Sequence, residues 1–143
     1  MLLSRSCEYG IRASIYVSMQ EGDEYVPIRI ISDDLGISAH FLTKILQQLS
    51  RAGILKSFKG PRGGVALARP AADVSLMELV EAIDGPDMFT DCMLGLPGCG
   101  DRKPCPLHNR WMEERERLTR LFSETRLSEI SASAAHTGAR LAT

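Results

Sequence analysis

The sequence predicts a mainly α-helical protein with one small β-hairpin, and three observations lead to this prediction. Short amphipathic helical patterns with a tight break between them fill residues 4–51. Two strand-like runs follow and are separated by a basic, glycine-rich turn. A long charged segment with an apolar seam then occupies residues 106–130. Together these patterns predict a winged helix-turn-helix followed by a long C-terminal dimerisation helix.

Residues 4–21 are expected to form the first helix, because apolar residues recur there at the helical period. These residues form one face: Cys7, Ile11, Ile15 and Met19. Either Ser4 or Ser6 can cap the start of this helix. The pair Gly22-Asp23 is expected to end it.

Two shorter helices are expected next, over residues 27–35 and from Ser38 to Gly53. The buried stripe of the later one is Leu42, Ile45, Leu46 and Leu49. Its other face holds hydrogen-bond donors and no carboxylate: His40, Thr43, Lys44, Gln47 and Arg51. A polar helix face is usually only solvated. Here the tight break before the helix and the absence of acid favour a helix that reads the DNA major groove.

Leu55–Phe58 and 65–69 are expected to pair as a β-hairpin around the basic turn 59–64. A hairpin directly after a helix-turn-helix is the wing of a winged helix. The wing carries four cations: Lys56, Lys59, Arg62 and Arg69. Arg62 lies at the flexible tip, where it can meet phosphates or enter a minor groove. An ordinary surface hairpin is the alternative.

The remainder divides into a last helix of the winged domain, a cysteine-rich loop and the long helix. Ser75 and Glu78 have capping-box spacing, so the winged domain is expected to span 1–86 and the loop 87–105. The seam of the helix over 106–130 predicts a dimer interface, with packing inside its own chain as the alternative. The seam comprises Leu107, Trp111, Leu118, Leu121 and Thr125. Residues 131–143 are expected to be a mobile tail.

Composition narrows the possible partners. The 143-residue chain has a net charge of −1, but residues 1–72 carry nine Lys and Arg against six Asp and Glu. A basic first half weakly suggests a polyanion such as double-stranded DNA. No apolar run approaches the roughly 20 residues of a membrane span, and no signal peptide is evident. The chain is therefore expected to be cytoplasmic, without a membrane partner, where thiols stay reduced.

Cys92, Cys99, Cys105 and His108 crowd into residues 91–108. Thiolate and imidazole ligands hold iron–sulfur clusters or zinc. A structural zinc site is an alternative, although no short C-x₂₋₄-C pair is present. A disulfide-rich loop, buried thiols and a cluster-free sensor of a small molecule are further alternatives. A thiol enzyme with Cys105 as nucleophile and His108 as base is not expected, because no substrate cleft or nucleotide loop is evident.

Residues 1–130 resemble the bacterial winged-helix regulators of the IscR, NsrR and RirA type. The resemblance is carried by these segments: Ile37-Ser38 before Phe41-Leu42, Leu46-Gln47-Gln48-Leu49 before Ala52-Gly53-Ile54-Leu55, the wing 59–64, the run 76–85 and the three cysteines. It implies a homodimeric transcription factor in which an iron–sulfur cluster tunes binding to operator DNA.

The resemblance also implies the ligands of that cluster. Cys92, Cys99 and Cys105 match the cysteines of the family, and His108 matches the position that completes the site in IscR-like members. A 2Fe–2S cluster is favoured over 4Fe–4S, although the sequence does not separate the two. Glu8 stands where some members use an acidic ligand from the partner subunit. Because Arg12 follows Glu8 by four residues, an ion pair between them is expected, and this favours His108.

Overall fold

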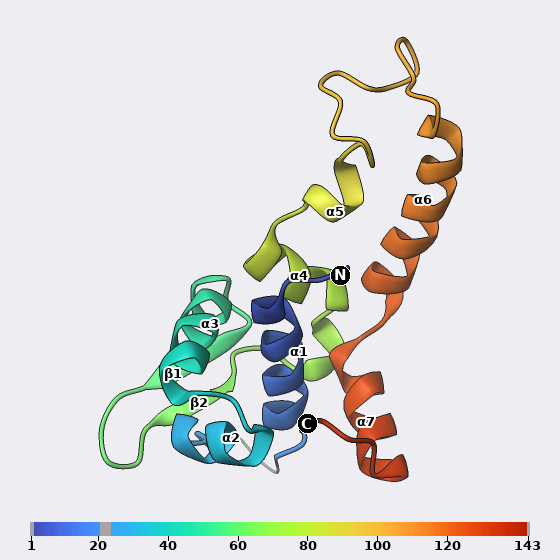
Figure 1. Cartoon of the computed structure of the whole chain (residues 1–143). Helices are drawn as coiled ribbons and strands as arrows, with labels where there is room; N and C mark the ends of the chain where they lie inside the picture. The colour runs from blue at the N-terminus through green and yellow to red at the C-terminus, as the bar shows by residue number, and fades with distance from the viewer. Residues whose placement is uncertain (1, 21–23, 143) are drawn as a thin grey trace.

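The computed structural model describes residues 2–20 and 24–142. Five elements form the first part of the fold (Figure 1): α1 (Arg5–Ser18), α2 (Ile28–Leu35), α3 (Ala39–Arg51), β1 (Leu55–Phe58) and β2 (Gly64–Leu67). Five more follow: the 3-10 turn η1 (Ala71–Asp73), α4 (Leu76–Asp84), α5 (Asp87–Thr90), α6 (His108–Glu124) and α7 (Leu127–Thr137). The predicted fold class, mainly helical with a small antiparallel wing, is confirmed.

Local sequence signals explain the helix boundaries. The Ser4 hydroxyl accepts a hydrogen bond from the Cys7 N–H at 3.1 Å and caps α1. Gly36 ends α2 with a φ of 67°, a left-handed conformation that glycine adopts without a Cβ penalty. Ser75 and Glu78 form the expected capping box of α4. Helix α1 ends at Ser18, with Met19 as its C-cap, before the predicted end at residues 21–23, which lie outside the described residues.

One apolar core holds the winged part together. In the wing, β1 and β2 pair antiparallel, with Leu55 opposite Leu67 and Phe58 opposite Gly64. Helices α1, α3 and α4 pack on one another, and α1 and α3 also contact this hairpin. The large side chains at the centre are fully buried: Ile31, Leu35, Leu42, Ile45, Leu46, Leu49, Ile54, Leu55 and Leu79. This packing presents the outer face of α3 and the wing on one side of the molecule.

The single helix predicted over residues 106–130 is wrong. Helix α6 begins at His108 and ends at Glu124, and Thr125 and Arg126 are extended. The Leu76 N–H donates to the Thr125 carbonyl at 3.0 Å, and the Leu127 N–H donates to Val74 at 2.8 Å. These tertiary bonds satisfy the backbone where the helix breaks, although no glycine or proline marks the break.

The predicted mobile tail is also wrong, because its first residues belong to α7. This helix packs on α1 and η1. Leu127 and Ala134 are buried in the main core, and the Ser131 hydroxyl bonds to that of Ser18. Small side chains allow α7 to approach α1 closely. The winged domain therefore needs residues far beyond the predicted boundary at residue 86.

The apolar seam predicted for dimerisation is divided between different roles. Leu118 packs on a second apolar cluster with Phe89 and Phe122. Trp111 bonds to the cysteine loop. Leu121 remains 56% exposed. None of the helices in the ranges 2–20 and 24–142 has both the length and the apolar character that a bilayer span requires.

Candidate metal centre

The cysteine loop projects from the far end of α6, away from α2 and the wing (Figure 1). Helix α5 supports its first arm, since the Phe89 ring meets that of Phe122 at a centroid distance of 5.5 Å. The second arm leads directly into α6. Two anchored arms therefore bring distant parts of the loop together.

The three loop cysteines converge. The sulfur atoms of Cys92, Cys99 and Cys105 all lie within 4.8 Å of one another. The sulfurs of Cys92 and Cys105 are 3.7 Å apart, and the Cys105 N–H donates to the Cys99 sulfur at 3.4 Å. All three side chains are half-buried and free of disulfides. The three predicted cysteines therefore form one group, and thiolates in such a group are suited to bind soft metals.

Local dipoles and burial give the thiols unequal acidity. The backbone N–H of Leu96 bonds to the Cys92 sulfur and lowers its pKa. Desolvation opposes this effect and the N–H of Leu94 adds to it, and the pKa of Cys92 falls to about 7. The Cys105 N–H lowers the pKa of Cys99, but desolvation and the neighbouring thiols outweigh it and the pKa is raised. Three adjacent thiolates repel one another, so a bound cation favours their joint deprotonation.

His108 lies beside this group. Its Nδ1 is 3.4 Å from the Cys99 sulfur, but the imidazole does not lie within 4.8 Å of all three sulfurs. Its Nε2 is buried and has no hydrogen-bond partner, although the exposed Asp101 carboxylate comes within 3.5 Å of it. The geometry of that contact is too poor for a hydrogen bond. An imidazole whose Nδ1 lies beside the Cys99 sulfur and whose Nε2 is buried without a partner fits a metal or iron–sulfur site.

The other predicted and neighbouring groups lie elsewhere. Glu8 is exposed on α1 and is not grouped with the loop cysteines of its own chain. The expected ion pair between Glu8 and Arg12 is not formed, because Arg12 donates to the carbonyls of Leu35, at 3.1 Å, and Leu141. Cys7 is fully buried, and desolvation together with Asp84 raises its pKa to about 12, so it is an inert core thiol.

The residues predicted to contact DNA do not all share one surface. Thr43, Gln47 and Lys59 line a groove of about 550 Å³ between α3 and the wing. Arg29 at the start of α2 lines the same groove and was missed by sequence reasoning. The signal in the sequence was its position in the first turn of the helix that follows Pro27. The side chains of His40, Lys44, Arg51 and Arg62 are exposed.

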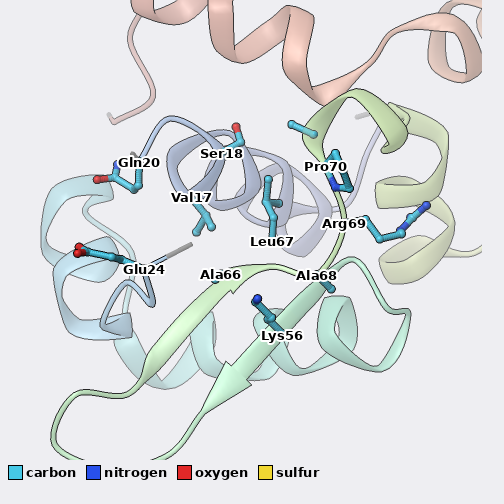
Figure 2. Close-up of a pocket in the computed structure, with 11 residues that line it drawn as sticks. Val17, Ser18, Gln20, Glu24, Lys56, Ala66, Leu67, Ala68, Arg69 and Pro70 are labelled. Atoms are coloured by element: carbon cyan, nitrogen blue, oxygen red, sulfur yellow. The ribbon is translucent and has the colours of Figure 1, made fainter. Parts of the chain in front are cut away.

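Lys56 lies on the other face of the hairpin. Figure 2 shows it beside a cavity of about 550 Å³ that it lines together with Val17 and Glu24. Its ammonium group sits 5.7 Å from the centre of the Tyr25 ring. Strand alternation explains this placement, because Ser57 faces α3 and bonds to Ser50 while its neighbours point away. Contact of Lys56 with DNA stays a prediction.

Comparisons with known proteins agree with this architecture. A family model described as Rrf2, iron-dependent transcriptional regulator, matches residues 3–133. The HTH-type transcriptional regulator IscR of Klebsiella pneumoniae is 30% identical over 130 residues, which make up 91% of this chain and 79% of that protein.

Two solved structures show the same fold. CymR, the global cysteine regulator of B. subtilis, has a TM-score of 0.78 at 19% identity and covers 92% of this chain and 96% of its own. IscR of T. potens has a TM-score of 0.75 at 20% identity and covers 96% of this chain and 91% of its own. With the family model spanning nearly the whole sequence, the chain belongs to the Rrf2 family of bacterial transcriptional regulators.

Proposed function

We propose that the protein is a homodimeric regulator that binds two-fold symmetric operator DNA and senses iron–sulfur, redox or nitric-oxide status through a bound cluster. One observation carries this proposal: three thiols meet within 4.8 Å on a loop joined to α6, in a chain whose relatives are transcriptional regulators. Reducing conditions in the cytoplasm would keep these thiols available as ligands.

Cys92, Cys99 and Cys105 would hold the cluster, with His108 as the fourth ligand. The partnerless Nε2 of His108 supports this choice. A neutral imidazole raises the reduction potential relative to a set of four thiolates. We favour 2Fe–2S over 4Fe–4S for this mixed ligand set. Glu8 of the partner subunit is the alternative, and the loss of its expected pairing with Arg12 makes it a stronger rival than its sequence indicated.

A continuous structural path would link the loop to DNA binding. The loop is joined to α6, and α6 is joined to the start of α4 by backbone bonds between 74–76 and 125–127. A change in loop order would shift α6 and, through a dimer, the spacing of two α3 helices about 34 Å apart. Coupling of this kind is typically worth about 1–3 kcal/mol, or roughly 5–150-fold in affinity.

The exposed face of α6 supports a homodimer. Leu121 is 56% exposed in the single chain. Charged residues surround it on the helix and could form complementary pairs with a second copy: Glu113, Glu114, Glu116, Arg117, Arg120 and Glu124. Sedimentation equilibrium tests this part of the proposal, and a monomer at high concentration would contradict it.

The central experiment is anaerobic purification followed by measurement of iron, acid-labile sulfide and visible absorption. We expect coloured protein whose operator affinity changes when the cluster is removed. Colourless protein with stoichiometric zinc, unaltered by cluster reconstitution, would instead support a zinc-stabilised regulator. Full operator binding by colourless, metal-free protein would support the cluster-free alternative that senses a small molecule.

A further inference from the structure

Two side chains of α6 hold the first arm of the cysteine loop. Trp111 donates from Nε1 to the Asp91 carbonyl at 2.8 Å. Arg115 donates from its guanidinium to the carbonyls of Thr90 and Asp91, at 2.8 and 3.1 Å. Residues four apart lie on the same face of a helix, so both donors reach the same short piece of backbone. Sequence reasoning assigned Trp111 to a dimer seam.

These bonds fix the peptide group that leads into Cys92. The Asp91 carbonyl belongs to the planar peptide that it shares with the Cys92 nitrogen, so its orientation constrains that of Cys92. With two donors, both acceptor positions of this oxygen are used. The sulfur of Cys92 then lies 3.7 Å from that of Cys105, thirteen residues later in the chain.

The rest of the loop is stabilised by local turns. The Gly95 N–H bonds to the Cys92 carbonyl at 2.9 Å, and the Cys99 N–H bonds to Leu96 at 3.3 Å. Such bonds shape the loop but do not determine where it meets α6. Phe89 anchors α5 on Phe122, and residues 90 and 91 remain between that anchor and Cys92. Trp111 and Arg115 act on these two residues.

We propose that Trp111 and Arg115 are positioning residues that preorganise Cys92 to share a metal or cluster with Cys99 and Cys105. This inference rests on the proposed function. A ligand already in place avoids the conformational cost of ordering on binding. Arg115 also lines the cavity of about 270 Å³ that the three cysteines and His108 border.

Cobalt(II) is the probe, because its thiolate charge-transfer absorption reports coordination without any regulatory assay. Reduced, metal-free full-length protein is titrated for the wild type, Trp111→Phe, Arg115→Gln and Arg115→Lys. We expect Trp111→Phe and Arg115→Gln each to weaken Co²⁺ binding about 10-fold and to shorten the lifetime of a reconstituted iron–sulfur cluster in a chelator. Arg115→Lys keeps the charge and should recover part of the loss.

Arg140→Gln is the control, because Arg140 is exposed and follows the end of α7, outside the cysteine loop and α6. Its Co²⁺ affinity should equal that of the wild type. Thermal unfolding of the metal-free variants should also match the wild type. Unchanged affinity and cluster lifetime in both Trp111→Phe and Arg115→Gln would overturn the inference, as would an equal loss of metal-free stability. A wild type that binds neither cobalt nor a cluster would overturn the proposed function itself.

Discussion

The winged part and the cysteine loop are held together by different means. In the winged part, Leu42 and Leu79 are fully buried among apolar neighbours. In the loop, most residues from 91 to 104 are exposed, including Met93 at 56%. The loop keeps its shape through short-range turns and a few hydrogen bonds to α6. Apolar burial stabilises the first region, whereas the second depends on polar contacts.

This difference would suit the sensing role that we propose. A region with little apolar burial opens at a low free-energy cost, while the core stays folded. Binding a metal to the thiols stabilises the ordered loop by mass action, and losing the metal returns it to a looser state. The fold can therefore change its loop without unfolding the domain that contacts DNA.

Removing a loop thiol should have the largest effect on the metal site and almost none on the core. Cys92→Ser replaces one of three soft ligands, and we expect the iron and sulfide content to fall to near background. The free energy of unfolding of the metal-free protein should change by less than about 0.5 kcal/mol, as for other surface substitutions. Urea unfolding of metal-free protein and metal analysis test both parts. Full cluster occupancy in Cys92→Ser would contradict the assigned ligand.

The reciprocal change targets the core. Leu42→Ala leaves a cavity beneath α3 and should lower the free energy of unfolding by about 2–5 kcal/mol. Leu121→Ala is the control, because Leu121 is exposed in the single chain, and urea unfolding should separate the two under conditions where both are monomeric. Below the unfolding transition, Leu42→Ala should still bind iron and sulfide. Loss of the cluster with the fold intact would show that the two regions are not independent.

The two regions also differ in how well they could be predicted from sequence. In the winged part, helical periodicity, the capping pair Ser75 and Glu78 and Gly36 placed the helices nearly as found. The break at Thr125 and Arg126 was missed, because backbone pairing with residues 74–76 imposes it and neither residue is a helix breaker. Local sequence signals do not predict a helix boundary that a tertiary contact determines.

For the site, ligand type and spacing predicted the three cysteines, and their sulfurs converge. The hydrogen bonds of Trp111 and Arg115 could not be predicted, since their acceptors are backbone carbonyls and any residue supplies one. The pairing of Glu8 with Arg12 was expected from spacing alone. It failed because Arg12 reaches carbonyls at the end of α2 and in the C-terminal segment.

The fourth ligand gives the next largest effect. His108→Ala should shift the visible spectrum and shorten cluster lifetime about 10-fold or more, because it removes the imidazole beside Cys99. Glu8→Ala is the matched comparison and should leave both unchanged if His108 completes the site. The opposite result, an effect of Glu8→Ala alone, would assign the ligand to the partner subunit and make cluster stability depend on protein concentration.

On the DNA-binding side, a wing substitution should have a moderate effect. Arg62→Ala removes one exposed cation at the wing tip, and we expect about 5–10-fold weaker operator binding, with the salt dependence reduced by about one ion. Fluorescence anisotropy over a range of salt concentrations measures both. Arg140→Ala, beyond the end of α7, is a control of equal charge. Equal losses for the two variants would indicate a general charge effect and contradict a specific wing contact.

The smallest expected effect comes from removing an ion pair between the base of the wing and α4. The guanidinium of Arg69 donates to the Glu78 carboxylate at 2.6 Å, and both side chains are 37% exposed. Partial burial opposes ionisation of Glu78, but the Ser75 N–H and Arg69 outweigh it and hold its pKa below the ordinary value. Solvent screening limits the pair to about 0.5–1 kcal/mol.

Because the folded pKa of Glu78 is lowered, its contribution is present above the unfolded pKa near 4.5 and is lost as pH falls through the folded value. Glu78→Gln can keep the hydrogen bond from the Ser75 N–H while removing the charge. We therefore expect a free energy of unfolding lower by up to about 1 kcal/mol at pH 7, converging with the wild type in acid. Urea unfolding of metal-free protein across this range measures the difference. A gap that persisted in acid, after Glu78 is protonated, would attribute the effect to packing, and Ser75→Ala would then separate the cap from the charge.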